Sequence, residues 1–344
     1  MISRKLTLAL VCVAFAACFK KDEDKAAPAP EATEAPAKKL PFEPLPEVEV
    51  DPKKVELGRR LYFDTRLSGD GTLSCASCHS FDKGGADAAK VSTGIRGQQG
   101  PINSPTVLNA HLNFVQFWDG RAKDLEEQAL GPVENPVEMG ATWPEVVERL
   151  KADEKMVEWF DALYEDGITK ENIAAAIAEF ERSLSTPAPF DRYLQGDEDA
   201  ISEKAKRGLD LFVKTGCVSC HTGPGLGGTM FQKFGLLEDY FPIRGGELTE
   251  ADLGRYNVTK NEADKHMFKV PLLRNVALTA PYFHDGSVDD LGRAVEIMAR
   301  VQLRKKLEPD EIEAIVAFLE TLTGELPPHA APPEDDEKEP KGEN

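Results

Sequence analysis

The sequence predicts a mainly α-helical protein made of two similar domains. A pentapeptide of the form Cys-x-x-Cys-His occurs at residues 75–79 and again at residues 217–221. A short amphipathic segment precedes each copy, and a second segment with apolar residues at helical spacing follows each copy. Signals for strands are scarce. With 344 residues, the chain is long enough for two domains that each bury a core.

Each pentapeptide has the residues and the spacing that attach haem c. Two thiols one helical turn apart form thioethers with the porphyrin, and the adjacent imidazole ligates the iron. Two Cys-x-x-Cys pairs could instead give zinc four thiolates, but zinc does not require the His that follows each pair, so the sequence favours haem. The predicted haem-binding residues are Cys75, Cys78 and His79 in the first copy and Cys217, Cys220 and His221 in the second.

The two ends of the chain predict targeting and disorder. Arg4 and Lys5 precede an apolar run at residues 6–17 that is too short to span a bilayer comfortably, which indicates a signal peptide at residues 1–18. Cleavage before Cys18 would leave a lipid anchor, and this is favoured; cleavage after Ala16 would give a soluble protein. Residues 19–45 are expected to form a disordered linker and residues 326–344 a disordered acidic tail.

Between these ends we expect an N-terminal domain at residues 46–190 and a C-terminal domain at residues 200–325. Residues 58–63 and 208–213 each combine a Gly with a Leu-aromatic pair ahead of a pentapeptide. Helical spacing follows at residues 173–184 and 312–322. Because a helix pair crossing beside a haem is typical of class I cytochromes c, we expect two domains of that kind. The Gly-rich segment 223–255 is expected to wrap the second haem irregularly rather than to form a sheet.

Composition limits the partners. A net charge of −19 argues against nucleic acid and favours a basic protein partner. Of the six cysteines, four lie in the pentapeptides, and Cys12 and Cys18 lie in the leader. No pair is therefore left for a disulfide in the body of the protein.

The group opposite each haem-ligating His separates an electron carrier from an enzyme. A second strong ligand favours electron transfer, whereas an open iron beside acid and base groups permits peroxide cleavage. For the second haem the preferred ligand is Met298, with Met230 and Met267 as competitors, because a thioether would raise the reduction potential. Spacing alone leaves open that Met298 only fills core.

The segment after the first pentapeptide offers acid and amide groups instead. No His occurs between residues 79 and 111, and no Met before Met139, but Gln128 and Glu138 lie in this region. A carboxylate can take the proton of peroxide and return it to the departing oxygen, and an amide can orient the bound oxygen. Taken singly, either side chain would more often be a solvated surface residue.

Longer segments resemble a known family. Residues 67–79, 103–110, 117–121 and 278–286 are similar to the bacterial di-haem cytochrome c peroxidases, and the likeness runs from about Leu57 to Leu322. The resemblance implies that His79 ligates the peroxidatic haem, with Glu138 and Gln128 in its distal pocket. It implies that His221 and Met298 ligate a high-potential haem.

The same resemblance implies roles for further residues. Trp118 would lie between the haems in the electron path. A calcium ion would be bound by Asn103, Thr279 and Pro281. His284 would lie at a haem edge and hydrogen-bond a propionate.

One position departs from the family pattern. Many members carry a removable His on the peroxidatic iron, and Ile95 occupies that place here. Isoleucine cannot ligate iron, so our hypothesis is that the first haem is open or water-bound even when the protein is fully oxidised.

The resemblance implies a periplasmic enzyme, often dimeric in the family, that reduces hydrogen peroxide to water. Its electrons would come from a small donor protein, either a monohaem cytochrome c or a cupredoxin. Two alternatives remain. A di-haem electron-transfer cytochrome without catalysis would have six-coordinate irons at both sites, and enzymes that oxidise a protein substrate use Tyr where Met298 stands.

Overall fold

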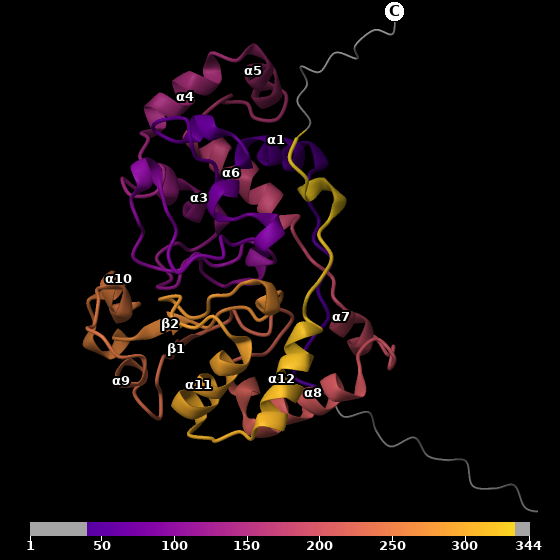
Figure 1. The fold of residues 1–344 in the computed structure, drawn as a ribbon. Coiled ribbons are helices and arrows are strands. Elements are labelled where there is room, and N and C mark those ends of the chain that lie inside the picture. The colour runs from indigo at the N-terminus through magenta and orange to yellow at the C-terminus, as the bar shows by residue number, and fades with distance from the viewer. Residues whose placement is uncertain (1–39, 334–344) are drawn as a thin grey trace, which may run out of the picture. The chain divides into compact units, whose positions relative to one another are not determined.

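The chain folds mainly into helices, as its sequence predicts (Figure 1). The computed structural model describes residues 40–333. The predicted signal peptide, most of the predicted linker and the end of the predicted tail lie outside these residues. None of the helices in the described part is long and apolar enough to cross a membrane.

The N-terminal half is built around the contact of its first and last helices. Asp51 caps α1 (Pro52–Tyr62) by accepting a hydrogen bond from the Lys53 N–H at 2.9 Å. Thr169 caps α6 (Lys170–Arg182) in the same way. These helices lie side by side in Figure 1. The helices between them are α2 (Cys75–Cys78), α3 (Leu125–Glu134), α4 (Trp143–Lys151) and α5 (Glu154–Asp161).

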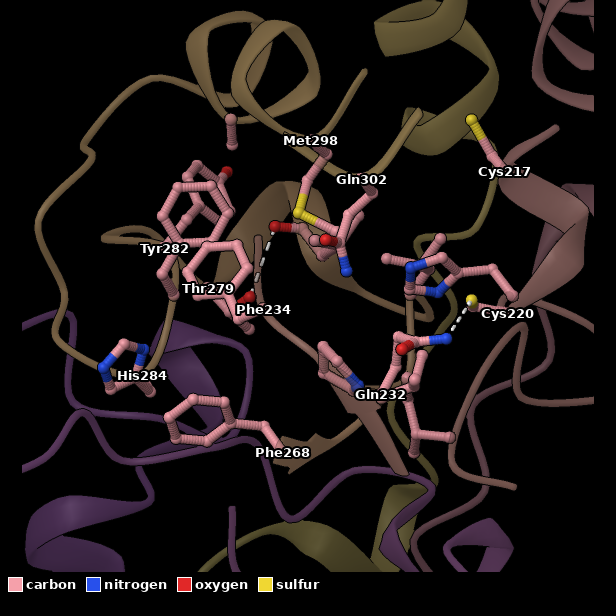
Figure 2. A pocket seen from close by; sticks show the side chains of 18 of the residues that line it. Cys217, Cys220, Gln232, Phe234, Phe268, Thr279, Tyr282, His284, Met298 and Gln302 are labelled. Carbon is pink, nitrogen blue, oxygen red and sulfur yellow. Dashed lines mark hydrogen bonds between the residues drawn. The ribbon is translucent and has the colours of Figure 1, made fainter. Parts of the chain in front are cut away.

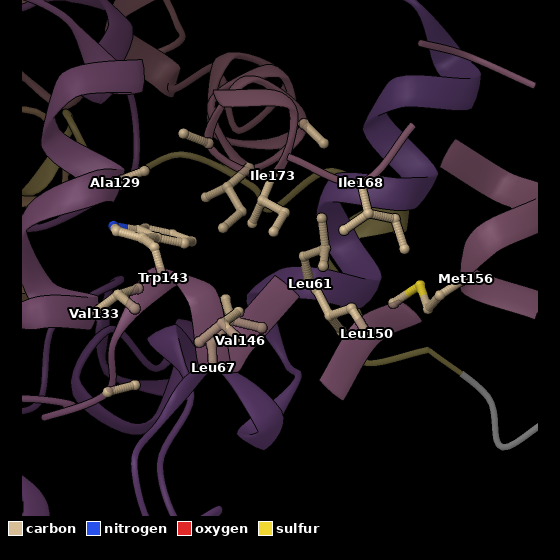
Figure 3. Close-up of a cluster of buried hydrophobic side chains, with 14 of the residues drawn as sticks. Leu61, Leu67, Ala129, Val133, Trp143, Val146, Leu150, Met156, Ile168 and Ile173 are labelled. Carbon is tan, nitrogen blue, oxygen red and sulfur yellow. The ribbon is translucent and has the colours of Figure 1, made fainter. Parts of the chain in front are cut away.

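A cluster of buried side chains holds α1, α3, α4, α5 and α6 together (Figure 3). Leu61 from α1, Ile173 from α6 and Val146 from α4 are all fully buried or nearly so. Since each comes from the apolar face of an amphipathic helix, their burial fixes how the helices pack. The core therefore follows from the periodicity that the sequence displays.

The C-terminal half repeats this plan. α8 (Glu203–Thr215) packs against α12 (Pro309–Glu320), and α11 (Leu291–Leu303) packs on α12. The remaining helices are the short α7 (Pro189–Leu194), α9 (Tyr240–Arg244) and α10 (Tyr256–Thr259). The strands β1 (Phe231–Lys233) and β2 (Met267–Lys269) pair antiparallel, with Phe231 opposite Lys269. The segment 223–255, which we expected to be irregular, thus contributes one short strand.

The helix crossing is the same in both halves. A Cβ on Gly58 of α1 would lie 1.9 Å from the carbonyl oxygen of Ala176, and a Cβ on Gly208 of α8 would lie 1.8 Å from that of Ala314. Only a glycine allows so close an approach. This equivalence supports the internal duplication inferred from the sequence.

From Pro41 onward the two halves belong to one unit. The Phe114 N–H donates to the Gly228 carbonyl at 2.8 Å, and the Asn103 N–H donates to that of His284 at 2.8 Å. Within two segments that we expected to be disordered, residues of the described parts, 40–45 and 326–333, are packed. Phe42 is buried against the rings of Phe190, Phe212 and Phe318, and His329 contacts Ser183.

Candidate functional site: two cysteine-histidine motifs and their surroundings

The first pentapeptide begins as a helical turn, α2, and ends at His79. The ring Nδ1 of His79 donates to the Gly85 carbonyl at 3.3 Å, and Tyr62 donates its hydroxyl to the His79 carbonyl at 2.7 Å. Burial lowers the pKa of His79 and raises the pKa of Cys75 to about 12. A neutral imidazole whose Nδ1 is bonded to the backbone leaves Nε2 free to act as a ligand.

The second pentapeptide has the same hydrogen bond at its His. His221 is buried, and its Nδ1 donates to the Leu226 carbonyl at 2.9 Å. Burial lowers the pKa of His221 to about 4 and raises the pKa of Cys217 to about 11. Both motifs therefore present an oriented, neutral imidazole beside two cysteine side chains.

A mainly apolar cavity of about 260 Å³ opens onto the second motif (Figure 2). Cys217, Cys220 and His221 form part of its wall. Two thiols and an oriented imidazole on an apolar cavity suit covalently attached haem c, and this donor set does not suit a hard cation. The described residues of the C-terminal half thus fit the group that the sequence predicts.

Met298 from α11 lies on the wall of the same cavity, and its sulfur points into it (Figure 2). Among the described residues that line the cavity, it is the one methionine; its competitors Met230 and Met267 do not line it. The position therefore favours Met298 over the two competitors as a candidate ligand.

Glu138 follows α3 and lies partly buried near the first motif. Its Oε1 accepts a hydrogen bond from Asn135 Nδ2 at 2.6 Å. Burial raises the pKa of Glu138, while the Arg121 charge and the Asn135 bond oppose the rise. The pKa of Cys78 is raised by burial first, and the negative charges of Asp87 and Glu138 add to this effect. The carboxyl group is thus close enough to the first motif to act on it electrostatically.

Ile95 lies against the segment that carries Glu138. The Ile95 N–H donates to the Glu138 carbonyl at 2.7 Å. Only 1 % of Ile95 is exposed, and its side chain packs against Gly69 and Gly140. The loop that bears Ile95 is therefore anchored to the core of the N-terminal half.

Gln128 and Trp118 are the other two predicted catalytic residues. Gln128 lies on α3 and is half-buried, and within residues 40–333 no hydrogen bond joins its side chain to Glu138. Trp118 lines the cavity of the C-terminal half, and its Nε1 donates to the Asn103 carbonyl at 2.9 Å. Trp118 thus contacts residues of both halves, since its carbonyl also accepts from the Lys269 N–H at 2.8 Å.

The predicted calcium ligands Asn103, Thr279 and Pro281 all line this cavity. His284 lines it as well, and its Nε2 bonds the Asp252 carboxylate at 2.8 Å. Asp252 is fully buried and also pairs with Arg244 at 2.6 Å. The bond to Asp252 fixes the orientation of the His284 ring.

Glu181 and Lys269 are among the buried ionisable side chains that sequence reasoning missed. Glu181 on α6 is buried, and burial raises its pKa to about 8. Lys269 on β2 is also buried, and burial lowers its pKa to about 8. In the sequence, Glu181 lies at helical spacing from Ile177 and Leu184 and so falls on the apolar face of a helix, which is a signal. Lys269 follows Phe268 and precedes Val270, which is a weaker signal.

Known proteins resemble this chain over most of its length. The family model described as di-haem cytochrome c peroxidase matches residues 52–199, and the cytochrome c model matches residues 205–323. Cytochrome c551 peroxidase of Nitrosomonas europaea is 44% identical over 96% of this chain and 95% of its own. Cytochrome c551 peroxidase of Pseudomonas aeruginosa is 45% identical over 83% of this chain and 85% of its own.

Two further matches add to this likeness. Cytochrome c peroxidase Ccp of Escherichia coli is 49% identical over 84% of this chain, which spans 62% of that longer protein. A solved MauG-like protein associated with microbial copper homeostasis has a TM-score of 0.73 and 32% identity, covering 88% of this chain and 99% of that chain. The family model and the full-length relatives agree, so this chain belongs to the di-haem cytochrome c peroxidase family, which implies two covalently bound haem c groups.

Proposed function

We propose that the N-terminal half reduces hydrogen peroxide and that the C-terminal half supplies the electrons. The reaction takes one peroxide molecule, two electrons and two protons and gives two water molecules. Haem c, held through Cys75, Cys78 and His79 and through Cys217, Cys220 and His221, supplies an iron that binds oxygen and exchanges electrons. The likeness to named peroxidases over nearly the whole chain supports the reaction.

Glu138 is the proton carrier. Its carboxylate takes a proton from the incoming peroxide and gives it to the oxygen that leaves, so that water rather than hydroxide departs. The environment of Glu138 carries this assignment: burial raises its pKa toward the range in which a carboxyl group both accepts and donates protons. Gln128 orients the peroxide by a hydrogen bond from its amide.

The C-terminal half stores and passes the electron. Met298 and His221, which line the same cavity, would together hold the iron of haem c there. A thioether ligand would stabilise the reduced state. Trp118, which bonds backbone atoms of both Asn103 and Lys269, bridges the route toward the first motif. A methionine in this place also supports peroxide reduction over oxidation of a protein substrate.

The remaining assignments concern the surroundings of the enzyme. The protein works in the periplasm, with a lipid anchor at Cys18. It forms a homodimer, and a calcium ion is held by Asn103, Thr279 and Pro281. Because the chain carries a net charge of −19, the donor is a basic monohaem cytochrome c or cupredoxin, and its association slows as salt is added.

Steady-state peroxide turnover of Glu138→Gln tests the assignment. Because glutamine keeps the shape but cannot carry the proton, we expect a loss of about 10²–10⁴-fold in kcat with haem content unchanged. Glu148→Gln, an exposed glutamate on α4 of the same half, is the control and should retain wild-type turnover. Equal turnover of Glu138→Gln and Glu148→Gln would rule out the role given to Glu138.

A further inference from the structure

The cavity of the C-terminal half contains one buried cation. Lys269, the last residue of β2, is 6 % exposed and lines this cavity with Cys217, Cys220 and His221. Among the described residues of the lining, Lys269 is the one Lys or Arg, and no Asp or Glu accompanies it. A lysine is almost never fully buried unless an opposite charge is near. The cavity therefore holds a positive charge that the protein itself does not balance.

The ammonium group has only a neutral partner. Nζ donates to Oδ1 of Asn113 at 2.9 Å, and no carboxylate in the described part of the chain pairs with it. Burial lowers the pKa of Lys269 to about 8, and no neighbouring negative charge offsets that effect. Since an ammonium has three N–H donors, two are left for a group that enters the cavity.

The backbone around Lys269 is well fixed. Its N–H donates to the Trp118 carbonyl at 2.8 Å, and β2 pairs with β1 with Lys269 opposite Phe231. Asn113 is held too, because the next residue, Phe114, donates its N–H to the Gly228 carbonyl at 2.8 Å. Because the backbone that carries the ammonium group is fixed, Lys269 offers a preorganised site for an anion.

We propose that Lys269, oriented by Asn113, binds a carboxylate of the haem in this cavity and raises the reduction potential of that haem. The inference rests on the proposed function, which assigns this cavity to the electron-storing haem. Haem c would bring two propionate carboxylates to a cavity whose described lining has no other Lys or Arg side chain. A charge-assisted hydrogen bond would satisfy both the buried ammonium and the buried carboxylate. The part of the lysine charge that the carboxylate does not cancel would stabilise the electron that reduction adds to the haem.

Redox titration of the haem-loaded protein tests the electrostatic part. Lys269→Met keeps the length and loses the charge, so the equilibrium constant for reducing the second haem should fall about tenfold, which is about 59 mV for one electron. Lys233→Met is the matched control, because Lys233 is exposed on the partner strand β1 and loses the same charge. A change in Lys269→Met no larger than that in Lys233→Met would overturn the inference.

A crystal structure of the unaltered, haem-loaded protein tests the contact and needs no variant that might fail to assemble. Lys269 Nζ should lie about 2.7–3.2 Å from a carboxylate oxygen of the haem. An Nζ that bonds only Asn113 and water would overturn the inference. Neither readout is peroxide turnover, so this inference can fail while the proposed function stands, and loss of turnover in Glu138→Gln is measured separately.

Discussion

In both halves of the molecule a helix glycine lies against a backbone carbonyl beside a cysteine-histidine motif. Gly58 on Ala176 and Gly208 on Ala314 set the same crossing, and His79 and His221 both bond a carbonyl through Nδ1. This shared framework orients the imidazole. It does not decide which side chains face each imidazole.

The halves differ in the side chains that surround the shared framework. The N-terminal half has two carboxyl groups, Glu138 and Glu181, whose pKa values burial raises. The C-terminal half has Met298 and Lys269 on its cavity wall. Acids that can move protons suit peroxide chemistry, whereas a thioether and a fixed cation suit electron storage. The comparison teaches that one scaffold can carry acids in one half and a thioether with a buried cation in the other.

Because both halves share this helix crossing, we expect a methyl group added to either glycine to lower the free energy of unfolding equally. In Gly58→Ala and Gly208→Ala the new Cβ would meet a carbonyl oxygen within 2 Å, and the free energy of unfolding should fall by about 3 kcal/mol in both. Thermal unfolding and haem content measure this effect. Gly131→Ala, in α3 with only one ring within ordinary contact distance, should not destabilise the protein. A loss of stability in only one of the two variants would show that the two helix crossings are not equivalent.

The proposed division of labour predicts that Met298 matters to one haem alone. Met298→Ala should lower the potential of the second haem by on the order of 100 mV, within the ~0.8 V range that axial ligands span. The spectrum of the first haem should stay unchanged. Potentiometric titration and electronic absorption report both effects. Met230→Ala and Met267→Ala serve as controls, since neither residue lines the cavity. If either control lowered the potential of the second haem as much as Met298→Ala does, the role given to Met298 would be wrong.

The proton-carrying role of Glu138 predicts a shift in the pH profile when Arg121 is neutralised. Arg121 lowers the pKa of Glu138 against the effect of burial, so Arg121→Gln should raise this pKa. Because the carboxylate is the form that accepts the proton, the loss of kcat/KM on the acid side should begin at a higher pH, by about 0.5–1 unit. Arg207→Gln, exposed in the C-terminal half, should leave the profile in place. A shift toward lower pH would contradict the sign of the argument.

The sequence predicts the helical framework better than it predicts the side chains packed around it. The helices α6 and α12 follow from apolar spacing at residues such as Ile173, Phe180 and Ile315, because burial of one face decides where a helix packs. The neighbours of Lys269 in the sequence indicate its burial only weakly, since its place depends on pairing with β1, which lies more than thirty residues earlier. The burial of Phe42 could not be predicted, because the average composition of its segment indicates disorder. Its ring nevertheless packs on three other phenylalanine rings.

Electron paramagnetic resonance of the fully oxidised, haem-loaded protein tests the difference between the halves most directly. Ile95 cannot ligate iron, and Met298 lines the cavity of His221. We therefore expect one high-spin signal from the N-terminal haem and one low-spin signal from the C-terminal haem. Two low-spin signals would show that both irons are six-coordinate with strong ligands, and the assignment of peroxide reduction to an open N-terminal site would be wrong.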